Sequence, residues 1–102
     1  MKRYSVVFAP EAAEQLDSLY AYVAAASSPA VALSYTNAIV SYCEGLDISP
    51  HRGMRRDDIR PGLRVTNYRK RAVIAFTVEA ELVSIIGIYY GGQDFESDLN
   101  VD

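Results

Sequence analysis

The chain has 102 residues, half of them hydrophobic, and a formal net charge of −3. This length and composition predict one globular domain over residues 1–102 with a modest core, and no apolar run approaches the ~20 residues that a membrane-spanning helix needs. Cys43 is the single cysteine and His51 the single histidine, which excludes an internal disulfide and any cysteine- or histidine-rich metal cluster. The apolar stretch 4–9 is too short for a signal peptide. We therefore expect a cytoplasmic protein that needs no cofactor, with Cys43 as a small buried hydrophobe.

The first half of the chain predicts one strand and two helices. Residues 4–8 are mostly β-branched or aromatic, as in a buried strand. Pro10 then stands at a favourable first helical position. Ser28 and Pro29 break the chain and start a second helix, with Ser28 as its N-cap. Two amphipathic helices joined by so short a break predict an antiparallel hairpin, with Tyr20 and Tyr35 on the buried faces.

The second half predicts three strands, over residues 63–68, 72–78 and 82–90. The turns between them, 69–71 and 79–81, are short enough for antiparallel hairpins. The resulting order is β-α-α-β-β-β, an α+β fold in which an antiparallel sheet packs against an α-helical hairpin. The acidic tail, about 96–102, either adds a short turn of helix or frays.

Charge is distributed very unevenly along the chain. Eight of the ten basic residues lie between Pro50 and Arg71, a segment that carries +6 once Asp57 and Asp58 are subtracted, whereas residues 72–102 contain no cation and six carboxylates. A basic band on an acidic domain indicates a surface that meets an anionic partner. An ordinary solvated loop and strand edge would also account for it.

Several local motifs resemble the RelE/ParE toxin superfamily, the toxin halves of bacterial toxin–antitoxin pairs. Residues 4–24 resemble the opening strand and helix of that superfamily. The Pro-x-Arg-Gly loop at Pro50–Gly53 and the Asp-x-x-Arg-Pro-Gly-Leu-Arg run at Asp57–Arg64 are similar to the ParE branch, as is the ending IYYGGQDFES at 88–97. None of these pieces is specific alone; their order and spacing carry the resemblance, which covers the chain from Tyr4 to about Leu99.

The two branches of the superfamily differ in mechanism. The RelE branch resembles ribosome-dependent mRNA endonucleases, which need a general base, a general acid and cations on the phosphate. In that branch these groups come from an arginine in the penultimate strand and from residues after the last strand. The corresponding positions here are Val73 and the segment Gly91–Phe95, without a cation or histidine. We therefore expect the catalytic set to be incomplete, and His51 is more typical of a solvent-facing loop residue than of a base.

The resemblance therefore implies a ParE activity: a non-enzymatic toxin that binds DNA gyrase and blocks replication. A divergent mRNA endonuclease, or a family member without toxicity, are the alternatives. The candidate target-binding residues are Arg55, Arg56, Arg60, Arg69, Lys70, Arg71 and Tyr90. Arg64, Asp94 and Phe95 are either structural or target-binding, and we expect Arg64 to pair with Asp94 or another carboxylate of the tail. Tyr89 and Tyr90, being neighbours in a strand, should divide into one core and one surface residue.

The resemblance also implies a protein partner. In the family the partner is a dimeric, ParD-like antitoxin whose own domain binds operator DNA, so that DNA binding belongs to the complex. We expect a hydrophobic groove between the helical hairpin and the sheet to receive an amphipathic segment of this antitoxin, most simply a helix.

Overall fold

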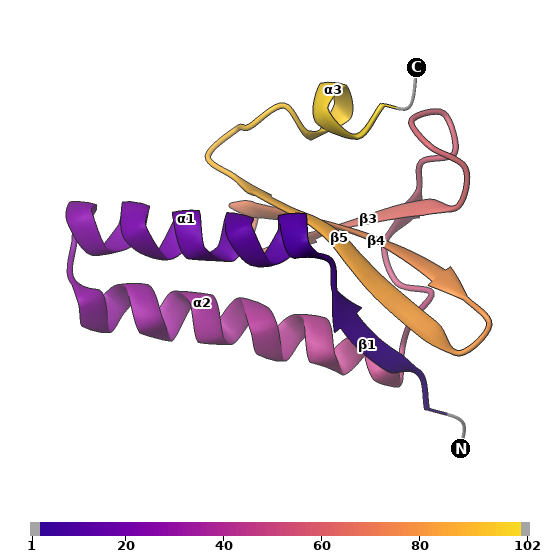
Figure 1. Ribbon diagram of the computed structural model, residues 1–102, viewed down its shortest axis with the longest axis horizontal. Helices are drawn as coiled ribbons and strands as arrows, with labels where there is room; N and C mark the ends of the chain where they lie inside the picture. The colour runs from indigo at the N-terminus through magenta and orange to yellow at the C-terminus, as the bar shows by residue number, and fades with distance from the viewer. Residues whose placement is uncertain (1–2, 101–102) are drawn as a thin grey trace.

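A computed structural model describes residues 3–100, which form a five-stranded sheet with helices on both faces (Figure 1). In chain order the elements are β1 Ser5–Phe8, α1 Pro10–Ala26, α2 Pro29–Glu44, a 3-10 turn Gly45–Asp47, β2 Met54–Arg55, β3 Leu63–Tyr68, β4 Ala72–Glu79, β5 Leu82–Tyr90 and α3 Phe95–Leu99. The strands lie in the order β1-β5-β4-β3-β2. The hairpin of α1 and α2 covers one face, and both helices extend past the sheet at the end where they join (Figure 1). In the described range, no helix combines the length and apolar character needed to cross a membrane.

The sheet is mixed, which corrects the expectation of an antiparallel sheet. Strands β2 to β5 are antiparallel to their neighbours, but β1 pairs with β5 in parallel, with Ser5 opposite Leu82. The short turns predicted the antiparallel pairs, whereas no turn links β1 to its partner. The helical hairpin carries the chain back to its starting end, where the Tyr4 amide donates to the Asp47 carbonyl at 2.8 Å. The short edge strand β2 was not predicted.

The helices begin where the sequence predicts. Pro10 opens α1, and the Ser28 hydroxyl caps α2 by accepting from the Val31 amide at 3.1 Å. Cys43 is fully buried in α2, as expected. The prediction for Tyr20 is wrong: its side chain is 36% exposed, because the preceding Leu19 occupies the buried position of that turn. Tyr35 is half-buried.

Two hydrophobic clusters fill the two sides of the sheet. The larger lies beneath the helical hairpin and contains Leu19, Ile39, Phe76 and Ile85 among its buried members. The smaller lies on the opposite face, where Tyr89, Leu63 and Leu99 of α3 pack together. The tail therefore folds back as α3 over the second face up to Asn100, and residues 101–102 of the predicted tail lie outside the described range.

A β-bulge in β5 sets which side chains face which cluster. Ala75 pairs with Gly87 and Phe76 with Ile85, which leaves Ile86 as the extra residue. Next to this bulge, the Gln15 side chain of α1 accepts a hydrogen bond from the Ile88 amide at 2.6 Å. This hydrogen bond connects β5 to α1 of the helical hairpin.

Gly87 permits the close approach of the Tyr89 ring, which leads to a first prediction. A Cβ at position 87 would lie 2.5 Å from Cε2 of Tyr89, whose ring is 4% exposed and therefore has little room to move. Gly87→Ala should lower the free energy of unfolding by about 2 kcal/mol, the typical cost of overpacking a core. Chemical denaturation measures this directly.

Gly45→Ala is the matched control. Gly45 has a helical backbone (φ −65°), and a Cβ added at this position would meet no side chain or distant backbone atom within 4 Å. Alanine there should leave stability unchanged or raise it by about 0.5 kcal/mol. If both substitutions behaved alike, the contact between Gly87 and Tyr89 would not be a constraint on the fold.

Candidate functional site

A concave surface opens where the helical hairpin extends past the sheet. Its volume is about 530 Å³, within the range of ligand and peptide side-chain pockets. We call this surface the tip pocket; it is lined by Leu19, Tyr22, Val23, Val31, Tyr35, Lys70, Arg71, Tyr90, Gly91 and Gly92. These residues come from α1, α2, the turn between β3 and β4, and the end of β5. The tip pocket thus brings together parts of the predicted groove and of the predicted basic band.

The turn between β3 and β4 projects three cations at the rim of the tip pocket. Tyr68 pairs with Ala72, and the intervening Arg69 and Lys70 both have positive φ, 52° and 61°. The Arg71 amide closes the turn on the Tyr68 carbonyl at 3.2 Å. Two successive positive φ values are typical of the tight turns that match the twist of a hairpin. All three side chains are exposed, as predicted for this turn.

None of the three turn cations has an acidic partner within residues 3–100: the ion pairs there involve Arg3, Arg55 and Arg56. Arg69 instead lies over the ring of Tyr68, with its guanidinium carbon 5.3 Å from the ring centre. Lys70 and Arg71 line the tip pocket. Positive charge at this turn is therefore available to an external anion.

Three tyrosines, Tyr22, Tyr35 and Tyr90, form another part of the lining. Tyr22 is 62% exposed, and its ring lies 5.6 Å from that of Tyr90. Burial raises the pKa of Tyr35, against the opposing effect of the nearby Arg71 charge. Tyr90 is half-buried on the helix side, whereas Tyr89 belongs to the core on the other face. The two tyrosines lie on opposite faces of the sheet as predicted, but Tyr90 packs against the larger cluster and is not simply a surface residue.

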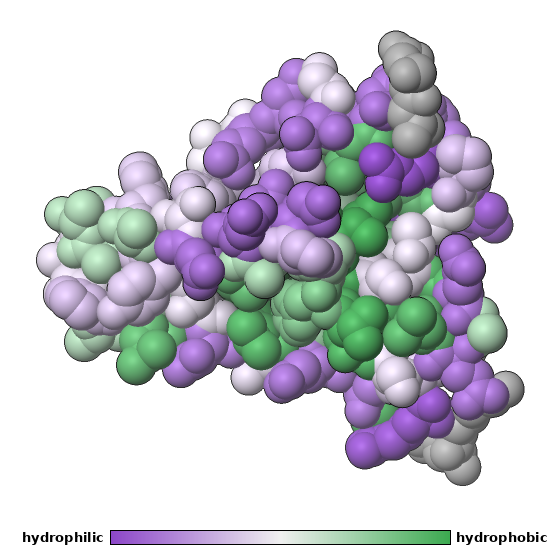
Figure 2. Space-filling view, viewed as in Figure 1, coloured by the Kyte–Doolittle hydropathy of each residue, from purple (hydrophilic) through white to green (hydrophobic). Residues whose placement is uncertain are grey.

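Apolar side chains form the rest of the tip pocket. Leu19 and Val23 of α1 lie at its floor, and Val31 of α2 is 48% exposed at its edge. On the face drawn in Figure 2, apolar surface also gathers over α2 and β1. Leu33 of α2 and Val7 of β1 are both exposed. Exposed apolar surface rimmed by polar residues is typical of an interaction site.

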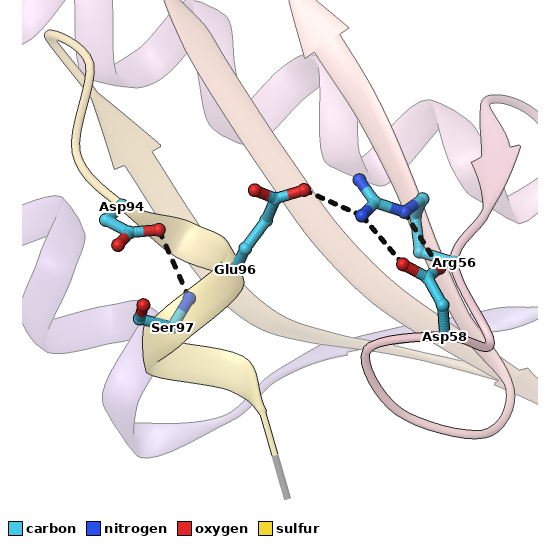
Figure 3. A network of polar contacts seen from close by, with 5 residues as sticks. All are labelled: Arg56, Asp58, Asp94, Glu96 and Ser97. Carbon is cyan, nitrogen blue, oxygen red and sulfur yellow. Dashed lines mark hydrogen bonds and ion pairs between the residues drawn. The ribbon is translucent and has the colours of Figure 1, made fainter.

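Two basic residues near the other end of β3, Arg55 and Arg56, already have acidic partners. Arg55 forms an ion pair with Asp57 at 3.1 Å. Arg56 binds Asp58 through two hydrogen bonds of 2.9 Å each and Glu96 of α3 at 2.7 Å (Figure 3). The hydrogen bonds from Arg56 hold the pKa of Asp58 below its ordinary value. This cluster fastens α3 to the loop before β3, so the segment 50–71 is not one continuous free basic band.

The motif Asp57–Arg64 has a structural role. The Asp57 carboxylate accepts a hydrogen bond from the Gly62 amide at 2.8 Å, which is the main reason its pKa is lowered, and Gly62 has a positive φ of 80°. Asp57 and Gly62 therefore close the loop that leads into β3. This loop accounts for the acidic residue and the glycine of the motif, Asp57 and Gly62.

The predicted pairing of Arg64 with a carboxylate of the tail is wrong. The Arg64 guanidinium donates to the carbonyls of His51 at 2.8 Å and Arg52 at 3.3 Å. Its neighbours in β3, Leu63 and Val65, face the cluster beneath α3, so Arg64 points to the opposite side of the sheet from the tail.

The two tail residues predicted with Arg64 belong to α3. Asp94 caps α3 by accepting from the Ser97 amide at 3.2 Å (Figure 3), and this hydrogen bond lowers its pKa. Phe95 packs against the ring of Tyr89, 6.1 Å between centroids. Both contacts lie within the tail and the second cluster, so both residues have a structural role.

The remaining candidates lie away from the tip pocket. Arg60 is half-buried, and its buried Nε has no hydrogen-bond partner among residues 3–100. His51 is exposed and lies with Arg55 and Arg64 around a small polar hollow of about 190 Å³. Its ring has an edge-on contact with Tyr4, 6.2 Å between centroids. Val73 packs into the cluster beneath α3.

Tyr22 and Val31 were missed by sequence reasoning. Both lie off the regular apolar stripe of their helices, and both are large apolar residues exposed to solvent. That departure from the stripe was the available signal, because an apolar side chain outside the core-facing positions can belong to a binding surface.

Tyr89 leads to a prediction on pH dependence. Burial raises its pKa to about 12, and its hydrogen bond to Asp98, 2.5 Å long, acts in the same direction. A group whose pKa is higher in the folded state contributes stability below its unfolded pKa, ~10 for tyrosine, and loses it as the pH rises through the folded value. The free energy of unfolding should therefore fall by roughly 2 kcal/mol between pH 10 and 12 through this group.

Tyr89→Phe should flatten this fall. Burial also raises the pKa of Cys43 to about 12, so part of the slope should remain in the variant. Denaturant titrations at several pH values measure both slopes. Equal slopes in the parent chain and the variant would contradict the assignment to Tyr89.

Comparisons with known proteins agree with this architecture. A family model described as the ParE toxin of a type II toxin–antitoxin system, parDE, matches residues 6–95. Among solved structures, one described as the chromosomal ParDE toxin–antitoxin system from P. aeruginosa is similar in fold, with a TM-score of 0.76 and 24% sequence identity. The similarity covers 86% of this chain and 96% of the other. A search of curated proteins gives no match.

Proposed function

The chain belongs to the ParE toxin family of type II toxin–antitoxin systems, and from this premise we propose that it arrests replication by binding DNA gyrase. The family match over residues 6–95 is the observation that carries the proposal. The mechanism is association and not bond cleavage. The toxin acts in the cytoplasm, where gyrase works on DNA.

The cations of the turn between β3 and β4 support this mode of action. Of the candidate cations, Arg69, Lys70 and Arg71 lie in a tight hairpin turn and have no acidic partner among the described residues. Arg55 and Arg56, by contrast, are paired with carboxylates. Unpaired surface cations steer a protein toward phosphates or acidic protein surfaces. We therefore assign the principal contact with gyrase, or with the DNA that it holds, to this turn together with Tyr90.

Val73 and the segment after β5 favour binding over ribonuclease chemistry. Val73 packs against the cluster beneath α3 and carries no group that could hold a phosphate. The segment Gly91–Phe95 offers an amide and a capping carboxylate, but no cation. His51 has no hydrogen-bond partner for its side chain within residues 3–100 that could orient it as a base.

Controlled expression of the chain alone tests this function. Growth should stop with a DNA-damage response while translation continues, and His51→Ala should be as toxic as the parent. Early translation arrest, with codon-dependent mRNA cleavage that His51→Ala abolishes, would replace gyrase binding with endonuclease activity.

We also propose that a dimeric, ParD-like antitoxin neutralises the toxin by placing an amphipathic, helical segment along the hairpin of α1 and α2. Exposed Tyr22 and Val31 supply apolar surface for it. Operator DNA is bound only through the antitoxin. Because apolar anchors outweigh charge in such a complex, it should survive about 1 M salt, where screening extends only ~3 Å. Ready separation from the product of the adjacent gene at that salt concentration would contradict the apolar contact.

A further inference from the structure

We propose that the tip pocket is the contact point that antitoxin and target both require, and that the antitoxin fills it with an apolar side chain followed closely by a carboxylate that pairs with Lys70 or Arg71. This inference rests on the proposed function, since it assumes that a toxin and an antitoxin meet at this surface. It adds the chemistry of recognition and the way in which the antitoxin would neutralise the toxin. Neutralisation then follows from direct occlusion.

The lining of the tip pocket defines its occupant. Leu19, Val23 and Val31 require an apolar group, because polar atoms placed among them would lose their hydrogen bonds to water. A volume of about 530 Å³ accommodates one large side chain and part of the backbone that carries it. Tyr22 and Tyr90 form the adjoining wall, with rings 5.6 Å apart. An aliphatic or aromatic anchor from a helix fits this lining.

The positive charge of Lys70 and Arg71 at the rim of the tip pocket predicts that the bound segment also carries a carboxylate. Lys70 and Arg71 line the same pocket and have no ion-pair partner among the described residues. The chain as a whole carries −3, so an acidic segment is repelled by most of the surface and attracted to this turn. A neutral or basic segment would leave the two cations facing an apolar contact without a partner. Charge complementarity therefore selects an acidic antitoxin segment over a basic one.

Competition follows from the shared lining. Tyr22 and Val31 line the same pocket as Lys70 and Arg71. A segment that fills this pocket covers the turn cations that we assign to the gyrase contact. The antitoxin and gyrase should therefore exclude each other without any change of shape in the toxin.

Titration calorimetry with the purified product of the adjacent gene tests the recognition. Lys70→Glu combined with Arg71→Glu should weaken binding at least about 30-fold near 0.15 M salt, the effect expected for close interfacial charges. Arg52→Glu combined with Arg55→Glu makes the same change in charge at two residues that do not line the tip pocket. That control should bind within about threefold of the parent. Equal weakening in both variants would overturn the inference, because the effect would then be one of overall charge.

A charge exchange makes the test specific to one pair. Each acidic residue of the antitoxin is replaced in turn by lysine and measured against the parent toxin and against Arg71→Glu. One replacement should weaken binding to the parent toxin. The same replacement should raise the affinity for Arg71→Glu at least about tenfold above that of the unmodified antitoxin for this variant. If none restores binding, no antitoxin carboxylate pairs with Arg71. The same exchange with Lys70→Glu then decides the proposal, and failure at both positions overturns it.

A capture experiment with gyrase tests the occlusion. Immobilised gyrase should retain the free toxin and lose it when the antitoxin is in excess, and a stable complex of all three proteins would overturn the occlusion. If gyrase does not retain even the free toxin, the gyrase target is wrong. The calorimetry and charge exchange still decide how the antitoxin is recognised, so the two failures are distinguishable.

Discussion

Reversing the two cations of the β3–β4 turn, by Lys70→Glu combined with Arg71→Glu, should abolish inhibition of gyrase while the protein stays folded. Both side chains are exposed, and neither forms an ion pair with another described residue. Reversing two charges at a contact replaces attraction with repulsion and should cost at least ~3 kcal/mol of binding, about 100-fold in affinity. The concentration of toxin that halves gyrase supercoiling measures this change.

Two controls accompany that measurement. Circular dichroism and melting temperature should hardly change, because surface substitutions of this kind cost within ~0.5 kcal/mol of stability. Arg52→Glu combined with Arg55→Glu should retain most of the inhibition, since neither residue lines the tip pocket: Arg55 pairs with Asp57, and the Arg52 guanidinium lies over the Tyr42 ring. If the folded turn variant inhibits gyrase as well as the parent, the turn is not the contact. If the control variant loses as much as the turn variant, net charge governs the interaction.

The largest effect on stability is expected for Phe76→Ala. Phe76 is fully buried in the cluster beneath the helical hairpin and is the largest such side chain in the described chain. Its truncation should cost about 3–5 kcal/mol, a large part of the 5–15 kcal/mol typical of a domain. For a domain of this length the melting temperature should fall by at least about 12 °C. Toxicity in cells should fall with it, because less folded protein is present.

Phe76→Leu is the matched control. Leucine keeps most of the apolar volume and should cost about 1.5 kcal/mol or less. A melting temperature within about 3 °C of the parent for Phe76→Ala would mean that the cluster tolerates a large cavity. In that case the stability of the fold would have to come mainly from the second face, under α3.

Local patterns predicted most of the fold. Pro10, Ser28 and Pro29 mark helix starts that the structure confirms, and the strands at 63–68 and 82–90 have the expected bounds. The signals were strong because each depends on a few neighbouring residues. The parallel pairing of β1 with β5 depends instead on where the helical hairpin returns the chain, which no local pattern records.

The candidate site was predicted only in part, for the same physical reason. The cationic turn at Arg69 followed from hairpin geometry and is exposed as expected. Which cations have acidic partners depends on contacts distant in sequence: Arg56 reaches Glu96, forty residues away. Likewise, Tyr22 joins Lys70 at one pocket because the helices extend past the sheet. A basic band in the sequence thus divides into a paired cluster and an unpaired turn.

Gyrase supercoiling in the presence of the purified chain tests the central claim most directly. With relaxed plasmid, ATP and increasing toxin, supercoiling should be lost and cleaved DNA should accumulate on the enzyme after denaturation of the protein. Adding the purified antitoxin should restore supercoiling in proportion to the toxin that it binds. Supercoiling at the normal rate at every concentration of folded toxin would contradict the account and leave this ParE family member without gyrase as its target.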